Sequence, residues 1–447
     1  MGVLGRMAEG ANLPETRTRE RPTLAGFANE FATEALPGAL PQGQNSPQKI
    51  AYGLVSELVS GTTFAAPRAL NRRSYLFRIR PSTITGEPSL LHHDTFLTPP
   101  FDVLPYPGPL RWGPAPIGGA AHDFLDGLMT ICGNGAPDRQ TGSAIHVYRA
   151  TRSMTGRAFA NADGDMLIIP QLGAITLITE LGILDVEPGE FALVPRGMKF
   201  RVDLRAGEAR GLVCENFGLP FVLPELGLLG SHGLANAIDF KAPVAAFEDD
   251  DRPVELVHKY CGQLWRFELD HSPFDVVAWR GNWAPVKYAM RDFATMGTVS
   301  VDHPDPSIFC ALTSPSSDVA GNNVDFMILP PRWVVAEHTF RPPGYHRNSV
   351  AEFLSLIQGT SESRSGDFPP GSMSLHNNWT AHGPDVAAFE GARTAALQPQ
   401  KIEDTMMIMI ESRYPFAQTT QAMNADFRIS NAGTGWAGFK KRFSDGD

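Results

Sequence analysis

Residues 187–204 read EPGEFALVPRGMKFRVDL, and this stretch decides the fold of the first half of the chain. From position 199 onward charged and apolar residues alternate, with apolar side chains at Phe200, Val202 and Leu204. A period of two is typical of a strand with one buried face. The Pro-Gly and Pro-Arg-Gly steps before it mark turns. The stretch therefore predicts short strands joined by tight turns, which is the sequence pattern of a β-barrel.

Patterns of the same kind recur on both sides of this stretch. Residues 74–81 (SYLFRIRP) alternate and predict a strand whose arginine-bearing face is the wetter one. Residues 324–328 alternate in the same way, and 406–412 (MMIMIES) also have strand character. Between them Asp385 is placed to cap a short helix in 386–397 (VAAFEGARTAAL). The 43 glycines and 37 prolines favour turns and short strands over long helices.

The turn before Lys199 resembles the conserved barrel turn of cupins, a P-G…P-R-G pattern. Lys199 and Phe200 stand in the region where a cupin usually places a metal-binding histidine, so this half is predicted to be metal-free and structural. We expect an all-β protein with a two-domain, cupin-like or jelly-roll architecture of barrel and sandwich and few short helices. The expected parts are a flexible arm (1–22), an N-terminal β domain (23–287) and a C-terminal cupin-like domain with the metal site (288–447).

Composition and charge narrow the range of partners. A formal net charge of −10 and a pI near 5.7, with no basic stripe, predict that the chain does not bind nucleic acid. No segment has the apolar core of a signal peptide, and no window approaches about 18 to 20 apolar residues, so we expect a cytoplasmic protein with no membrane partner. Cys132, Cys214, Cys261 and Cys310 are widely scattered, which predicts reduced thiols.

The second half contains three candidate metal ligands, His346, Glu352 and His382. The first two lie an even number of residues apart, so an extended strand would project both to one face. Gly359 and the Pro-Pro-Gly step at 369–371 predict a hairpin that returns the third ligand to the first pair. Two imidazoles and one carboxylate with open coordination positions suit Fe(II). From spacing alone, each of the three could equally be a hydrogen-bonded core residue.

Several long stretches, in a fixed order, carry a family resemblance. They read GFANEFATEALPGALPQGQNSPQ (26–48), ELVSGTTFAAPRALNRRSYLFRIRPS (57–82), NADGDMLIIPQLG (161–173), HGLAN (232–236), DHPDPSIF (302–309), PPRWVVAEHTFRPPGYHRN (330–348) and SLHNNWTAHGPD (374–385). Through them the chain resembles the homogentisate 1,2-dioxygenase family of iron-dependent, ring-cleaving enzymes of phenylalanine and tyrosine breakdown. The likeness runs from about Gly26 to the C-terminal region.

The resemblance implies an activity and the residues that support it. It assigns Fe(II) to His346, Glu352 and His382, and it assigns the acceptance of the substrate's proton to His303. It implies that homogentisate and O₂ are converted to maleylacetoacetate, with the ring opened between the hydroxylated carbon and the carbon that bears the acetate side chain. It further implies a homo-oligomer, a hexamer formed from two trimers.

Three side chains, His382, Ser361 and His376, are predicted to contact the substrate. His376 lies six residues before His382 and so on the same strand face, where it could be a pocket donor or a simple structural histidine. On its residues alone, His303 would be a loop histidine packed by Pro304 and Pro306.

Ser361 departs from the family pattern, which usually has a tyrosine that contacts the substrate nine residues after the glutamate ligand. Trp379 and Ala381 also depart from the commoner pattern before the last ligand. Loss of an aromatic hydroxyl would alter substrate anchoring without touching the three ligands. Two alternatives therefore stay open: a related dioxygenase for another para-dihydroxylated aromatic acid, and a metal-binding cupin without oxygenase activity.

Overall fold

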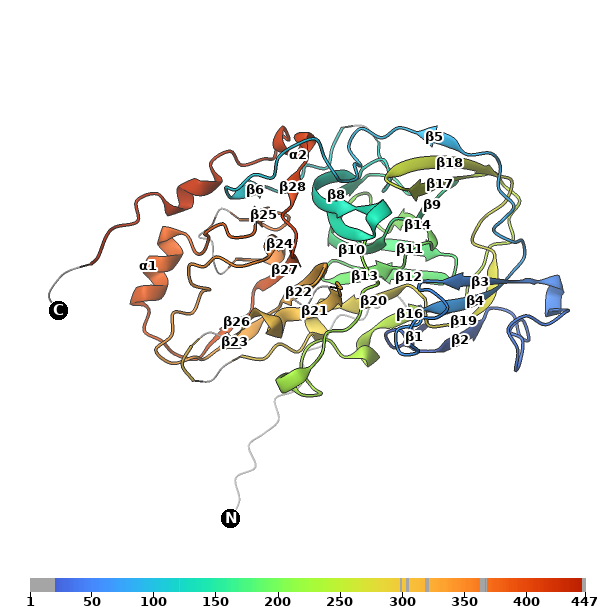
Figure 1. The fold of residues 1–447 in the computed structure, drawn as a ribbon, viewed down its shortest axis with the longest axis horizontal. Coiled ribbons are helices and arrows are strands. Elements are labelled where there is room, and N and C mark those ends of the chain that lie inside the picture. The colour runs from blue at the N-terminus through green and yellow to red at the C-terminus, as the bar shows by residue number, and fades with distance from the viewer. Residues whose placement is uncertain are drawn as a thin grey trace, which may run out of the picture.

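The computed structural model describes residues 21–119, 121–297, 300–302, 305–317, 321–361, 366 and 368–443. Within these ranges the chain forms five β-sheets and two short α-helices, which confirms the all-β prediction. The N-terminal half and the C-terminal half lie side by side, blue to yellow and orange to red in Figure 1. No helix of the described part is long and apolar enough to cross a membrane.

The N-terminal half is built on three sheets, whose strands follow in spatial order. The nine-stranded sheet contains β1 (Thr23–Ala25), β16 (Lys241–Pro243), β20 (Val286–Ala289), β13 (Glu190–Val194), β10 (Asp165–Leu172), β15 (Ala209–Asn216), β8 (Thr141–Ala150), β7 (Met129–Ala136) and β28 (Ala417–Gln418). The seven-stranded sheet contains β12 (Gly182–Val186), β11 (Ile175–Thr179), β14 (Lys199–Leu204), β9 (Arg157–Asn161), β17 (Val254–Tyr260), β18 (Gln263–Leu269) and β5 (Ser89–Leu91). The four-stranded sheet contains β2 (Phe31–Glu34), β19 (Val276–Gly281), β4 (Arg73–Arg78) and β3 (Val55–Ser60).

The C-terminal half is built on one six-stranded sheet and one strand pair. The large sheet contains, in order, β21 (Cys310–Ser314), β22 (Val324–Leu329), β27 (Thr405–Ser412), β24 (Ala351–Gly359), β25 (Met373–His376) and β6 (Leu110–Trp112). The pair is β23 (Arg332–Val334) with β26 (Gln400–Ile402), and the helices are α1 (Val386–Thr394) and α2 (Thr420–Met423). Short 3-10 helices are η1 (Ala51–Gly53), η2 (Pro137–Arg139), η3 (Gly227–Leu229), η4 (Ala237–Asp239), η5 (Met290–Asp292), η6 (Pro306–Phe309) and η7 (Ala432–Trp436).

The stretch 187–204 forms the strands that its pattern predicts. In β14 the side chains of Phe200 and Val202 are buried, and the strand pairs antiparallel with β11 and β9. Phe200 packs edge-on against Phe159, with ring centroids 5.6 Å apart, so an aromatic side chain fills this part of the interior. Lys199 instead donates to Glu180 and Ser82. In the described structure Phe200 thus serves packing and Lys199 serves ion pairing.

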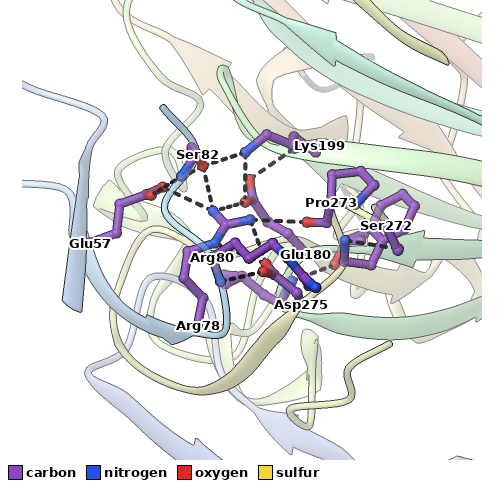
Figure 2. Close-up of polar contacts among 12 residues, drawn as sticks. Glu57, Arg78, Arg80, Ser82, Glu180, Lys199, Ser272, Pro273 and Asp275 are labelled. Carbon is purple, nitrogen blue, oxygen red and sulfur yellow. Dashed lines mark hydrogen bonds and ion pairs between the residues drawn. The ribbon is translucent and has the colours of Figure 1, made fainter. Parts of the chain in front are cut away.

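The strand predicted in 74–81 exists as β4, but its arginine-bearing face is not wet. Arg78 is 1% exposed and lies between the four-stranded and seven-stranded sheets. Figure 2 shows its guanidinium surrounded by the carboxylates of Glu57, Glu180 and Asp275, at 3.0, 3.3 and 2.7 Å. The prediction of a wet face was wrong because these carboxylates, distant in sequence, satisfy the buried cation.

The two halves share one hydrophobic core and exchange strands. Phe191 of β13 packs against Phe326 of β22 with ring centroids 5.1 Å apart. Strand β6, from the first half, pairs with β25 of the six-stranded sheet, while β28, from the second half, pairs with β7 of the nine-stranded sheet (Figure 1). The predicted boundary at residue 287 falls inside β20 of the nine-stranded sheet.

Other local predictions hold. Asp385 caps α1 by accepting a hydrogen bond from the Ala388 backbone N–H at 2.7 Å, and the helix ends at Thr394. Strands β22 and β27 lie where alternation and apolar character predicted them. The four cysteines are free thiols, three of them buried and Cys261 exposed.

Candidate metal centre

Glu352 and the two candidate histidines reach the same point from different local structures. Glu352 lies near the start of β24 and is paired across the hairpin with His376 of β25. His346 and His382 lie outside the strands and form an isolated antiparallel bridge, with His346 N–H donating to the His382 carbonyl at 2.9 Å and the reverse bond at 3.1 Å. The hairpin prediction is confirmed. The prediction that His346 and Glu352 share one strand was wrong, because the bridge takes His346 out of β24.

The bridge also ends the continuous strand that was predicted for His376 and His382. After His376 the chain turns at Trp379, whose backbone has a left-handed φ of 60°. The Thr380 N–H and hydroxyl both donate to the Asn377 carbonyl, which closes the turn. His376 and His382 nevertheless meet, because their rings stack with centroids 4.4 Å apart and planes 5° from parallel.

Both metal-candidate histidines have one ring nitrogen engaged by a backbone carbonyl. Nδ1 of His346 lies 2.8 Å from the Gly344 oxygen, and Nδ1 of His382 lies 3.0 Å from the Thr380 oxygen. A carbonyl only accepts, so each Nδ1 must carry the proton and each Nε2 of a neutral ring presents a lone pair. Each Nε2 lone pair faces the Glu352 carboxylate, which is also an acceptor. A cation, either a proton or a metal ion, must therefore lie between each Nε2 and the carboxylate.

The ligand atoms are close enough for one ion. Nε2 of His346 lies 3.5 Å from Oε1 of Glu352, and Nε2 of His382 lies 3.2 Å from Oε2. The ligand atoms of the three side chains lie within 4.8 Å of one another. Atoms bound at right angles to a transition metal about 2.1 Å away are about 3 Å apart. The side chains therefore fit a 2-His-1-carboxylate metal site.

The electrostatics of Glu352 favour its anionic form. Burial alone would raise its pKa, but hydrogen bonds from His346, His382 and Asn348 outweigh burial and hold the pKa well below the usual range. The hydrogen bond to Glu352 is also the main reason that the pKa of His346 is raised. Asn348 donates its amide to Oε1 and so fixes the rotation of the carboxylate. The His346 side chain is 38% exposed, so the centre has an open side.

A row of ionisable side chains crosses the metal-bearing sheet beside the centre. Asp325, Glu411, Glu352 and His376 are direct partners on β22, β27, β24 and β25, so their side chains lie on one face. Burial, followed by repulsion from Glu352 and Asp325, raises the pKa of Glu411 to about 8. Glu411 is therefore neutral at pH 7 in the metal-free protein, next to an ionised ligand.

The other predicted site residues are placed unequally. His376 is buried against the ring of His382, while Ser361 follows the far end of β24. At about 3.3 Å per residue, the seven steps from Glu352 to Gly359 already span roughly 20 Å. Ser361 borders a 740 Å³ groove beside α1, and its contact with a substrate stays a prediction. His303 lies outside the described residues.

Sequence reasoning missed two parts of the site. Glu411 lies in the predicted strand 406–412, but its position opposite Glu352 depends on which strand pairs with β27 and in which register. The carbonyls of Gly344 and Thr380, which fix the histidine tautomers, depend on local turns. The turn residues Gly344 and Asn377-Asn378 were the available hints.

The sheets define an all-β protein, and His346, Glu352 and His382 form a candidate 2-His-1-carboxylate metal site. Two family models match the chain end to end: "Homogentisate 1,2-dioxygenase N-terminal" over residues 23–290 and "Homogentisate 1,2-dioxygenase C-terminal" over residues 291–443. The chain belongs to the homogentisate 1,2-dioxygenase family.

Several solved structures are similar to this chain at low identity. A cupin 2 conserved barrel domain protein from Leptotrichia buccalis is 8% identical, with a TM-score of 0.29 over 66% of this chain and 92% of that one. A bacterial pirin from Escherichia coli, in complex with nickel(II), is 9% identical, with a TM-score of 0.28 over 68% and 99%. A deletion mutant of Bacillus subtilis oxalate decarboxylase is 10% identical, with a TM-score of 0.30 over 69% and 78%. The assignment to the family rests on the two family models.

Proposed function

We propose that this chain is an Fe(II)-dependent dioxygenase that opens the ring of homogentisate with O₂ to give maleylacetoacetate. The observation that carries the proposal is the pair of Nε2 lone pairs directed at Glu352, in a chain that belongs to this family throughout residues 23–443. When bound there, iron supplies a path for electrons from an aromatic substrate to dioxygen.

The protein's own residues prepare the centre. His346, Glu352 and His382 would hold the ion, and Gly344, through its carbonyl, keeps the ring of His346 in the tautomer that can coordinate. Asn348 restrains one carboxylate oxygen of Glu352. The exposed edge of His346 leaves room for an aromatic ligand on the open side.

Proton removal from the substrate hydroxyl is assigned to His303 as part of this proposal. A neutral imidazole with a pKa near the working pH suits that task. On the described side of this position, Asp302 N–H donates to the Thr339 hydroxyl, and Asp305 caps η6 by accepting from the Ser307 N–H.

The test is oxygen uptake by protein reconstituted anaerobically with Fe(II) and given homogentisate, with the product identified by mass. The expected result is stoichiometric uptake and a product heavier by two oxygen atoms. Glu352→Gln should abolish turnover and weaken iron binding, and retained uptake in this variant would remove Glu352 from the mechanism. Iron binding without uptake would favour the alternative substrates, which a panel of hydroquinone acids including gentisate would separate.

We also propose the homo-oligomer that the family implies, a hexamer of two trimers. Because the strand between Glu352 and Gly359 spans roughly 20 Å, we infer that Ser361 approaches the metal centre of another copy and not that of its own chain. Sedimentation of the purified protein tests the assembly, and Ser361→Tyr then tests whether the position affects the KM for homogentisate.

A further inference from the structure

The last described segment, residues 431–443, crosses the two turns that carry the metal histidines. We call it the C-terminal strap; it follows α2 and runs past α1 at the left of Figure 1. Its 3-10 helix η7 ends at Trp436, whose indole Nε1–H points at the carbonyls of Gly383 and Pro384, 3.3 and 3.0 Å away. These are the two residues that directly follow His382.

The strap also packs on the residue before the other histidine. The ring of Phe439 meets Tyr345 edge-on at 6.0 Å between centroids, and it meets Phe389 of α1 at 5.1 Å. Tyr345 in turn packs closely against Gly383: a Cβ on Gly383, where φ is +157°, would lie 2.6 Å from the tyrosine ring. The strap thus contacts a neighbour of each metal histidine, on both sides of the bridge.

Arg442 fixes the far end of the strap. Its guanidinium pairs with Glu390 of α1 and lies 5.9 Å from the ring centroid of Phe389 and 5.8 Å from that of Phe439. Both charged side chains are about one-third exposed, so this ion pair adds little stability and mainly orients the strap. The aromatic contacts and the Trp436 hydrogen bonds carry the remaining attachment.

The bridge needs such support because it is small. Two backbone hydrogen bonds, between His346 and His382, join segments that belong to no strand of a sheet. A short isolated strand pair is marginal in water unless it packs on other elements. Small openings of this pair would move both Nε2 atoms away from Glu352, whereas Glu352 itself is held in the six-stranded sheet.

We propose that Trp436 and Phe439 are positioning residues of the metal centre: through Gly383 and Tyr345 they hold the His346–His382 bridge closed over Glu352. The metal part of this inference rests on the proposed function, while the closure of the bridge does not. The contacts described above join the strap to Gly383, Pro384 and Tyr345, so its effect should appear in the backbone of the bridge before it appears at the metal.

The experiment uses the full chain with Trp436→Phe and Phe439→Leu, alone and together. Both keep an apolar ring or side chain of similar size, so folding is retained while the hydrogen bonds and the edge-on contact are lost. Trp333→Phe is the matched control, because Trp333 is 61% exposed on β23 and touches neither histidine turn. Hydrogen exchange of the metal-free proteins is followed by mass spectrometry in peptides that cover 340–350 and 376–384.

In the double variant, hydrogen exchange in these two peptides should be about tenfold faster, while exchange in β24 and β27 should not change. A tenfold change is what the loss of one hydrogen-bonded contact of ordinary strength would give. Iron transfer to a chelator should accelerate by a similar factor. Unchanged exchange in both peptides, or an equal acceleration throughout the chain, would overturn the inference. Faster exchange in a protein whose wild type binds no iron would support the strap and reject the proposed function instead.

Discussion

Replacement of Arg78 by methionine should destabilise the protein severely. Three carboxylates, those of Glu57, Glu180 and Asp275, surround the buried guanidinium, and Lys199 is the other cation that pairs with Glu180 (Figure 2). Removing Arg78 changes the charge of this cluster from −1 to −2 at a site that is 1% exposed. Breaking a buried ion pair by removing one partner costs about 3 to 5 kcal/mol.

The assay is urea unfolding of the metal-free protein, followed by tryptophan fluorescence and by far-UV circular dichroism. Coincident transitions would permit conversion of the midpoints to free energies. Arg252→Met is the matched control, because the Arg252 side chain is 86% exposed and pairs with Asp250 at the surface. It should shift the unfolding midpoint far less than Arg78→Met, because an exposed ion pair adds little stability. An Arg78→Met variant no less stable than Arg252→Met would refute this reasoning.

The pH dependence of the free energy of unfolding provides a second test of the Arg78 cluster, and the direction of the expected change is fixed. Burial would raise the pKa of Glu57, but Arg78 and Ser82 outweigh burial and lower it. A lowered folded pKa contributes stability above the unfolded value, near pH 4.5, and this contribution is lost as the pH falls. Without Arg78 the largest of the interactions that lower the pKa of Glu57 is lost. The stability gap between wild type and Arg78→Met should therefore narrow as the pH falls below about 5.

Three more predictions concern the metal-bearing sheet. Gly359→Ala should lower the free energy of unfolding by more than about 1 kcal/mol, because φ is +76° and the new Cβ would lie 2.4 Å from the Asp404 carbonyl oxygen. Gly391→Ala in α1 is the control: its Cβ would meet nothing, so it should raise the thermal midpoint. Stability of the metal-free protein should fall as the pH rises from about 4.5 to 8, because the raised pKa of Glu411 makes its ionisation unfavourable, and Glu411→Gln should flatten this slope in denaturant titrations. Iron affinity should weaken as the pH falls through the raised pKa of His346, because that ring must lose a proton to bind; isothermal titration that showed equal affinity at pH 6 and 8 would contradict this.

Much of the fold could be predicted from local patterns. The period of two placed β14 and β22, and Asp385 placed the start of α1, because these signals lie within a few residues. The face of β4 could not be judged in this way. Arg78 looks solvent-facing in isolation, and carboxylates distant in sequence make its burial possible: Asp275 just before the neighbouring strand β19, and Glu180 just after β11 of the seven-stranded sheet.

The three metal ligands were found for a partly mistaken reason. Even spacing predicted that His346 and Glu352 share a strand, whereas His346 reaches the centre through a bridge with His382. Residue spacing cannot foresee a turn such as that at Trp379. Residue spacing also could not show where Ser361 lies relative to Glu352. Nine residues separate the two, and most of them form the extended strand β24, which carries Ser361 away from Glu352. A family pattern gives positions in the sequence and not distances within one chain.

The exchange of strands between the halves has a consequence during synthesis. β6 leaves the ribosome long before β25, its partner in the six-stranded sheet, is translated. At about 5 to 20 residues per second the delay is on the order of 10 to 50 s. Until then Leu110, Arg111 and Trp112 belong to a nascent chain that cannot yet bury them where the finished protein does. We therefore expect the N-terminal half to keep this short strand unpaired until β25 is synthesised.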